Sequence, residues 1–329
     1  MEVNVIRRHP YRSIGHATVT QLQPKDWIRP VTPQAPAREV PGAGSPLTRA
    51  LLPGPSRHGL VLASFPTALY LLVGEHHEVL PVLASDAVML PTATRLSAAG
   101  RDIVWGVEPG DTVTVGRSRI RLPGWRVRLV REWRPAKVRP VPTPPEPGLL
   151  TELADILSSH VSTPELVDQA TAVCRAARCA DDAAVRRGVR HMLGAGQGLT
   201  PSGDDVLCAV LLVLNGAGDA PAVAILGAAV QDRWTATTSL SASLLDAARK
   251  GYAVPECAAL VERALCGDLA GAREALTSTL AIGHSSGQDM VSGLAGSLRA
   301  LADTSSPARL SSLTIRSART LQTAERGNP

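Results

Sequence analysis

Aromatic residues are scarce in this chain: they make up 3% of its 329 residues, and only one of them is Phe. The core must therefore be built from Ala, Leu and Val, which indicates closely packed helices of small residues. Hydrophobic residues nevertheless reach 44% and charged residues 19%, and this balance excludes a wholly disordered chain. The length allows two domains, and stability requires neither disulfides nor a structural metal.

Cysteine is also scarce, and its arrangement excludes a disulfide framework. The five residues are odd in number, contain no Cys-x-x-Cys pair and mostly lie in apolar helical patterns, where a thiol behaves as a small hydrophobic group. Long apolar runs are missing too: no stretch meets the ~18 residues of a membrane span, and the first ten residues lack the apolar region of a signal peptide. A cytoplasmic protein without a membrane segment is therefore expected.

Lysine is nearly absent, so almost all positive charge is carried by Arg. The charge is also unevenly divided: residues 1–150 contain 19 Lys and Arg against 11 Asp and Glu, whereas residues 151–329 contain 15 against 18. Any polyanionic partner is therefore expected to bind the first half.

Changes in composition divide the chain into five segments. Residues 1–56 are rich in proline and lack periodicity, which predicts a loose arm. Residues 57–134 contain short β-favouring runs between Gly and Pro, which predicts a small antiparallel β barrel or sandwich. A stiff proline-rich linker over 135–147 then leads to an α-helical domain over 148–303, and residues 304–329 form a polar tail expected to fray. The predicted fold class is α+β.

The most unusual stretch is a glycine-rich loop that opens directly into an apolar helix, and it runs Gly194-Ala-Gly196-Gln-Gly198-Leu-Thr200-Pro-Ser202-Gly203-Asp204-Asp205. Backbone N–H groups at such a positive dipole end suit a phosphate or carboxylate. The loop is not a Walker A motif, because no Lys follows, and no β-run precedes it as a Rossmann turn requires. The candidate anion-binding residues are Gly196, Gly198, Thr200, Ser202 and Gly203.

Helix capping is the simpler interpretation of the same loop. Ser202 would be the N-cap, with Asp205 as the acidic residue three positions later. Capping explains these two residues, but it explains neither the three glycines nor Asp204. We therefore favour a functional loop in which Asp204 handles protons and Asp205 has a capping or secondary role.

A second segment, residues 282–294, repeats this design. Ser286-Gly-Gln-Asp289 aligns with Ser202-Gly-Asp-Asp205, so both have the form Ser-Gly-x-Asp at a predicted helix start. Ser285 and Ser286 are candidate anion-binding residues, and Asp289 is a second capping residue. His284 is a proton carrier in a hydroxyl-rich loop, which makes it the second catalytic candidate. Two capping boxes that resemble each other by chance are the alternative.

Two further patterns have simple explanations. The segment from Thr237 to Ser243 contains five hydroxyls, which bind oxyanions or merely satisfy backbone N–H groups at a helix start. Arginines alternate along two predicted strands, at Arg117, Arg119 and Arg121 and then at Arg126 and Arg128. A solvated strand face is favoured over a nucleic-acid surface, so nucleic acid is not an expected partner.

No metal site or cofactor is predicted. The histidines show no zinc spacing, and Asp204, Asp205 and Asp289 are the residues that could hold Mg²⁺ together with a substrate phosphate.

Three motifs together carry a family resemblance, and they are Gly198-Leu-Thr-Pro-Ser-Gly-Asp-Asp205, Thr237-Thr-Ser-Leu-Ser241 and Gly283-His-Ser-Ser-Gly-Gln-Asp289. With them the chain resembles the AllH-type (YlbF-type) family, long described as a domain of unknown function. The resemblance covers about residues 45–302. It implies a subunit of oxamate carbamoyltransferase from allantoin degradation, which requires partner subunits and acts on small carboxylate- or phosphate-bearing substrates.

Two functions stay open at this point. The first is a component of a multi-subunit carbamoyl or acyl transferase, inactive without its partners, in which loop N–H groups and hydroxyls bind a small anion and stabilise a tetrahedral intermediate. The second is a noncatalytic scaffold or metabolite-binding regulatory subunit, because the sequence offers no complete pair of nucleophile and base.

Overall fold

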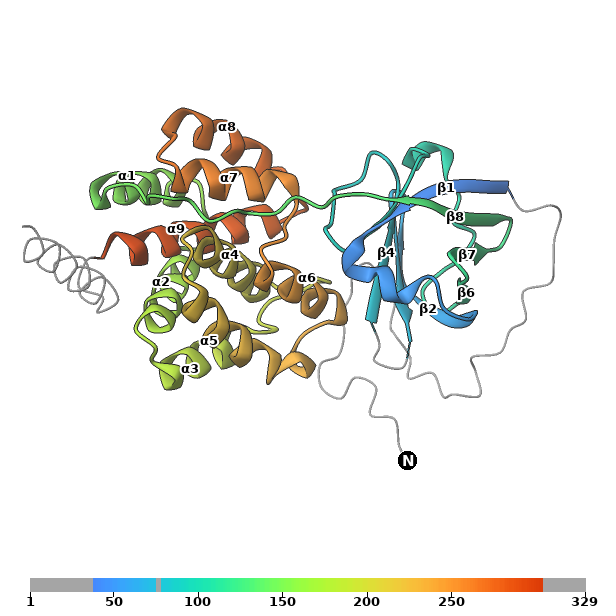
Figure 1. The fold of residues 1–329 in the computed structure, drawn as a ribbon, viewed down its shortest axis with the longest axis horizontal. Coiled ribbons are helices and arrows are strands. Elements are labelled where there is room, and N and C mark those ends of the chain that lie inside the picture. The colour runs from blue at the N-terminus through green and yellow to red at the C-terminus, as the bar shows by residue number, and fades with distance from the viewer. Residues whose placement is uncertain (1–37, 75–77, 304–329) are drawn as a thin grey trace, which may run out of the picture.

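The computed structural model describes residues 38–74 and 78–303, which form a β barrel followed by a helical region (Figure 1). This arrangement confirms the predicted α+β class. Within these two ranges, no helix has the length and apolar character needed to cross a membrane. The predicted tail over 304–329 lies outside the described residues.

Eight strands close the barrel in the order β1-β5-β4-β3-β2-β6-β7-β8. Their bounds are β1 Arg38–Gly44, β2 Arg57–Phe65, β3 Ala68–Val73, β4 Glu78–Leu83, β5 Thr94–Leu96, β6 Thr112–Gly116, β7 Arg119–Leu122 and β8 Trp125–Glu132. β1 is parallel to β8 and β4 is parallel to β5, whereas the other neighbours are antiparallel. The predicted antiparallel arrangement is therefore wrong for two pairs, because their strands are joined by longer connections rather than by hairpins.

The first strand comes from the stretch that was predicted to be a loose arm. β1 pairs with both β5 and β8 and closes the barrel, and a 3-10 helix, η2 Pro46–Leu51, follows it. Val40 and Leu52 are buried in the barrel core. The prediction of a loose arm is thus wrong for residues 38–56, since apolar burial and strand pairing outweigh their proline content; residues 1–37 lie outside the described residues.

The helices of the described region are α1 Pro147–Ser158, α2 Pro164–Arg178, α3 Asp182–Met192, α4 Ser202–Gly216, α5 Ala220–Gln231, α6 Ser239–Arg249, α7 Pro255–Leu265, α8 Leu269–Leu280 and α9 Ser286–Ala302. α4 and α9 are buried along most of their length and contact each other, and α9 also contacts α1 and α2. A Cβ atom at Gly293 or Gly296 of α9 would collide with the backbone of α4 or α2. Small residues therefore allow the close helix packing that the low aromatic content predicts.

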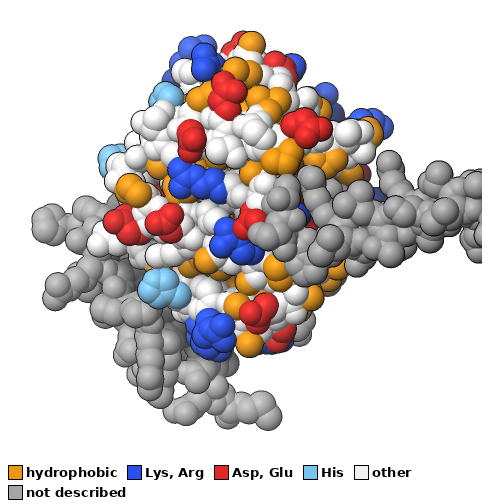
Figure 2. All heavy atoms as spheres, turned by 90° about the vertical axis from the view of Figure 1, so that its left-hand side faces the viewer, with side chains coloured by type: hydrophobic (Ala, Val, Ile, Leu, Met, Phe, Trp, Pro, Cys, Tyr) orange, Lys and Arg blue, Asp and Glu red, His pale blue; other side chains and the backbone are white. Residues whose placement is uncertain are grey.

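The proline-rich segment between barrel and helices runs along the helical region. Val138 is buried, and its N–H donates to the carbonyl oxygen of Gly251 at 2.9 Å. Lys137 forms an isolated β-bridge with Tyr252 and lies over its ring. The far end of the helical region carries acidic, basic and apolar side chains interspersed with one another (Figure 2).

Candidate functional site

The starts of α4 and α9 meet, so the two Ser-Gly-x-Asp segments form one cluster. The hydroxyls of Thr200 and Ser286 lie 3.0 Å apart, at hydrogen-bond distance, although 86 residues separate them. We call Thr200, Ser202, Asp205, Ser286 and Asp289 the paired-loop cluster. One small ligand could contact both loops, as the sequence comparison of the two segments predicts.

The serines and aspartates of this cluster interact across the two helices. Burial raises the pKa of Asp205 on α4 to about 8, and the Ser286 hydroxyl on α9 opposes this rise. Burial likewise raises the pKa of Asp289 on α9, and the hydroxyls of Ser202 on α4 and of Ser285 oppose it. Each serine of a Ser-Gly-x-Asp segment thus stabilises the charged form of the aspartate in the other segment.

The glycines of the two segments allow each helix to begin against the preceding helix. A Cβ atom at Gly203 would collide with the carbonyl oxygen of Met192 at the end of α3, and one at Gly287 would collide with that of Thr279 near the end of α8. The N–H of Gly203 donates to the carbonyl oxygen of Ala195 at 2.9 Å. The N–H of Gly203 is thus occupied by the chain itself and the residue serves close packing, so the anion-binding role predicted for it stays a prediction without a free backbone donor.

Two other loop glycines differ in their surroundings. Gly196 has φ +124°, and a Cβ atom there would lie 2.6 Å from the Ser202 nitrogen, which makes it part of a tight turn. Gly198 has φ +92°, and no atom lies within 4 Å of its Cβ position. Of the three glycines predicted to bind an anion, Gly198 is therefore the one that borders open space.

Asp204 holds the loop in place through both carboxylate oxygens. Oδ1 accepts the N–H of Gly194 at 2.7 Å, and Oδ2 accepts the hydroxyl of Thr237. Burial raises the pKa of Asp204. The two hydrogen bonds lower it, and the one from Thr237 has the larger effect. With 1% of its surface exposed, Asp204 connects α4, the glycine-rich loop and the segment before α6. These contacts position the loop, and the catalytic role predicted for Asp204 stays a prediction.

Asp205 differs from Asp204 in having one carboxyl oxygen without a partner among the described residues. It is 6% exposed, and its Oδ2 atom is buried without a hydrogen-bond partner in the described part of the chain. The capping interpretation is wrong: Pro201 occupies the N-cap position, Ser202 is the first residue of α4, and no side chain caps the helix. With a pKa of about 8, Asp205 is mostly protonated at neutral pH and can both donate and accept a hydrogen bond.

The α9 side of the cluster has the same features. Asp289 is 7% exposed, and its Oδ2 atom also lacks a hydrogen-bond partner among the residues described. Ser285 occupies the N-cap position without a side-chain capping bond, so the capping role predicted for Asp289 finds no matching contact. His284 and Ser285 are exposed in the loop before α9, and Ser286 is half-buried.

The hydroxyl-rich segment before α6 belongs to this site, which its sequence alone did not establish. Thr237 bonds Asp204, and the hydroxyl of Thr238 donates to the carbonyl oxygen of Leu199 at 2.6 Å in the glycine-rich loop. Thr238 also caps α6 by accepting the N–H of Ser241 at 3.0 Å. The signal was present as a run of hydroxyls, but the contacts to the loop span more than 30 residues of sequence.

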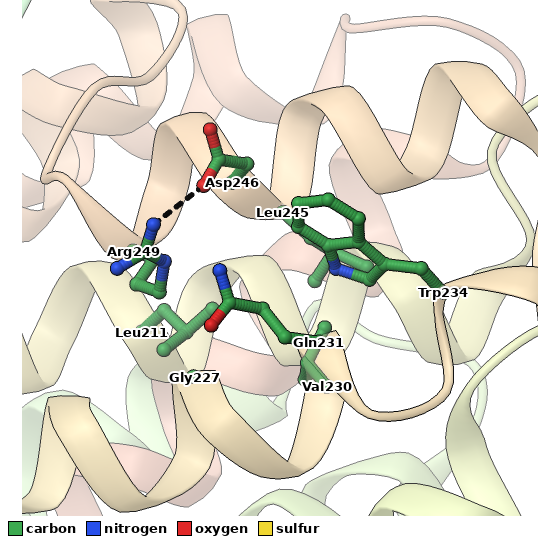
Figure 3. Close-up of a pocket in the computed structure, with 8 residues that line it drawn as sticks. All are labelled: Leu211, Gly227, Val230, Gln231, Trp234, Leu245, Asp246 and Arg249. Carbon is green, nitrogen blue, oxygen red and sulfur yellow. Dashed lines mark hydrogen bonds and ion pairs between the residues drawn. The ribbon is translucent and has the colours of Figure 1, made fainter. Parts of the chain in front are cut away.

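No metal-binding group of three or more His, Cys, Asp or Glu side chains occurs within residues 38–74 and 78–303. Two small pockets lie elsewhere in the helical region, and neither is lined by a residue of the paired-loop cluster. Figure 3 shows one of them, between α5 and α6, where Asp246 and Arg249 form an ion pair of 2.7 Å. The paired-loop cluster itself combines the buried Asp205 and Asp289 with the half-buried hydroxyls of Thr200, Ser202 and Ser286.

Residues 192–298 match the family model of the oxamate carbamoyltransferase subunit AllH. This match confirms the family resemblance predicted from the three motifs. The matched segment extends from the end of α3 into α9, so it contains the glycine-rich loop, the hydroxyl-rich segment and the whole paired-loop cluster. No solved structure matches the chain at a significant level.

Proposed function

We propose that this chain is a subunit of an oxamate carbamoyltransferase-like complex and that its paired-loop cluster binds a small carboxylate- or phosphate-bearing substrate. One observation carries the proposal: the two Ser-Gly-x-Asp segments, both within the AllH match, meet through the Thr200–Ser286 contact. The family match supports the assignment to a carbamoyltransferase complex. The geometry supports one shared site.

The protonation of Asp205 makes an anionic ligand compatible with a cluster that contains aspartates. If these aspartates and Asp204 were all charged, they would repel a carboxylate or phosphate. Burial raises the pKa of each, and that of Asp205 to about 8. A neutral carboxylic acid in a poorly solvated site can donate a hydrogen bond to an oxyanion, and the hydroxyls of Thr200, Ser202 and Ser286 can add further donors.

Carbamoyl transfer needs two proton movements that these residues can serve. The nitrogen that attacks the carbamoyl carbon loses a proton, and the departing phosphate gains one. Asp205 takes the role of proton donor because its carboxyl is protonated at neutral pH, while exposed His284 remains the predicted acceptor. Hydroxyls that point at the developing oxyanion stabilise the tetrahedral intermediate. Asp204 keeps the glycine-rich loop in position.

The proposal is tested by phosphate release from carbamoyl phosphate in the presence of oxamate. The full chain is assayed alone and together with the proteins encoded by adjoining genes, as wild type, Asp205→Asn and Asp168→Asn. Asp168 is exposed on α2 and serves as a matched control. We expect turnover to require the chain together with its partners, and to fall at least tenfold with Asp205→Asn alone.

A noncatalytic subunit is the second candidate, favoured by the position of both small pockets away from the cluster. It predicts that Asp205→Asn and the control variant support equal turnover in complexes of equal yield. That result would overturn the catalytic role of the cluster and leave the chain as a scaffold.

A further inference from the structure

The outer face of β7 and β8 carries arginines in register across the two strands. Arg119 lies opposite Arg128, and Arg121 lies opposite Arg126. Ile120, which lies between Arg119 and Arg121 on β7, is buried. Because side chains alternate along a strand, the arginines project from the outside of the barrel. We call these four residues the arginine face. Like charges directly opposite each other in a sheet are destabilising, so this arrangement does not serve the stability of the isolated chain.

Little in the described chain neutralises this face. Glu39 of β1 forms an ion pair of 2.5 Å with Arg128. Over residues 38–74 and 78–303, the structure gives no ion pair for Arg119, Arg121 or Arg126. The Nε atom of Arg126 is buried and has no hydrogen-bond partner in the same ranges. Among the residues described, Arg119, Arg121 and Arg126 thus have no carboxylate partner.

The backbone holds the arginine face in a fixed position. The turn between β6 and β7 places Arg117 at φ 51° and Ser118 at φ 56°, a region that non-glycine residues seldom adopt. Their N–H groups donate to the carbonyl oxygens of Gly54 and Leu52 at 2.8 and 2.7 Å, which secures the turn. A partner would therefore meet a backbone that is already ordered, and the ordering cost on binding would come from the arginine side chains.

We infer that the arginine face docks a carboxylate-rich surface of a partner protein. Guanidinium groups bind carboxylates with two parallel hydrogen bonds, and the Glu39–Arg128 pair shows that a carboxylate fits this face. Val130, two residues after Arg128 on β8, is 48% exposed, which adds the apolar contact typical of protein interfaces. The inference is independent of the paired-loop cluster and goes beyond the proposed function.

The two undescribed ends of the chain carry net positive charge, so neither offers the carboxylate-rich surface that this face requires. Residues 1–37 contain five Lys and Arg against two Asp and Glu, and residues 304–329 contain four against one. A single-stranded nucleic acid would need aromatic side chains on which its bases stack. Trp125 instead lies on the other side of β8 in the alternation of the strand, and Arg38 lies over its ring, 5.3 Å from the centroid.

The test compares two double variants of the full chain. Arg119→Gln/Arg121→Gln removes half of the arginine face, and Arg187→Gln/Arg190→Gln removes two exposed arginines from α3. The probes are a fluorescein-labelled glutamate-rich 20-residue peptide and a 20-residue oligothymidylate, measured by fluorescence anisotropy at low and moderate salt. Thermal melting checks the fold, and the face variant should melt no lower than wild type.

We expect the peptide to bind wild type, the face variant to bind it at least tenfold more weakly, and the α3 variant to stay within twofold. An equal loss of peptide affinity in the face variant and the α3 variant would overturn the inference, as would the absence of peptide binding by wild type. So would two other results: oligothymidylate that binds the face more tightly than the peptide, which would indicate a nucleic-acid surface, or self-association lost in the face variant, which would indicate a second copy of this chain.

Discussion

Replacing Asp205 by Asn should stabilise the protein at neutral pH even as it removes the proposed function. A carboxyl in an unfolded chain has a pKa of about 3.9, whereas burial raises that of folded Asp205 to about 8. Between these values the native state binds one proton more than the unfolded state. The unfolding free energy therefore falls by about 1.4 kcal/mol per pH unit as pH rises from about 4 to about 8.

Asn has a similar shape and does not titrate, so the variant escapes this loss. At pH 7, about three units above the pKa of the unfolded chain, the unfolding free energy of Asp205→Asn should exceed that of wild type by ~4 kcal/mol. The excess should approach zero near pH 4. Asp204 and Asp289 also have raised pKa values, but they titrate in both proteins and largely cancel in the comparison.

Urea denaturation of wild type, Asp205→Asn and the exposed control Asp168→Asn at pH 4.5, 6, 7 and 8 measures this effect. The unfolding free energy of Asp205→Asn should exceed that of wild type by an amount that grows with pH, while the control follows wild type. A difference that stays constant across the series, or that favours wild type increasingly as pH rises, would refute the reasoning.

Asp204→Asn should act in the opposite direction and lower stability by ~1 to 3 kcal/mol, because a buried acceptor of two hydrogen bonds is replaced by a group that is part donor. Denaturation at pH 7 checks this, and a stability equal to wild type would contradict the positioning role. Gly203→Ala should cost ~3 kcal/mol or more, since the new methyl group meets a backbone carbonyl that cannot move freely. Gly54→Ala, where no atom lies within 4 Å of the Cβ position, is its control, and an equal change in melting temperature for both variants would count against close packing.

The sequence was sufficient for features that depend on local pattern. Short β-favouring runs identified β2, β3, β4, β6, β7 and β8 but not the three-residue β5, and Ser, Asp and Pro signals marked most helix starts. It did not identify β1, because proline density hid a strand whose pairing partners, β5 and β8, lie more than 50 residues away. The two parallel pairs escaped for the same reason: register between distant strands is a tertiary property.

In the candidate site, too, local motifs could be predicted from the sequence, whereas contacts between distant segments could not. The two Ser-Gly-x-Asp segments could be found by comparing the chain with itself, and the structure brings them together. The sequence separated Asp204 from Asp205 by a capping argument alone, because it could not show the contact between Asp204 and the hydroxyl of Thr237, which lies 33 residues away. The capping argument placed the helix start one residue too late, and that single shift changed the interpretation of both carboxyls.

The claim that both helix starts form one functional site is tested most directly by a double-mutant cycle on phosphate release by the reconstituted complex. Ser202→Ala and Ser286→Ala each remove a hydroxyl that interacts with the aspartate of the other segment. If the site is shared, the fold-loss of activity in the double variant should be smaller than the product of the fold-losses in the two single variants, because residues in one network couple. Losses that simply multiply, or single variants as active as wild type, would contradict it.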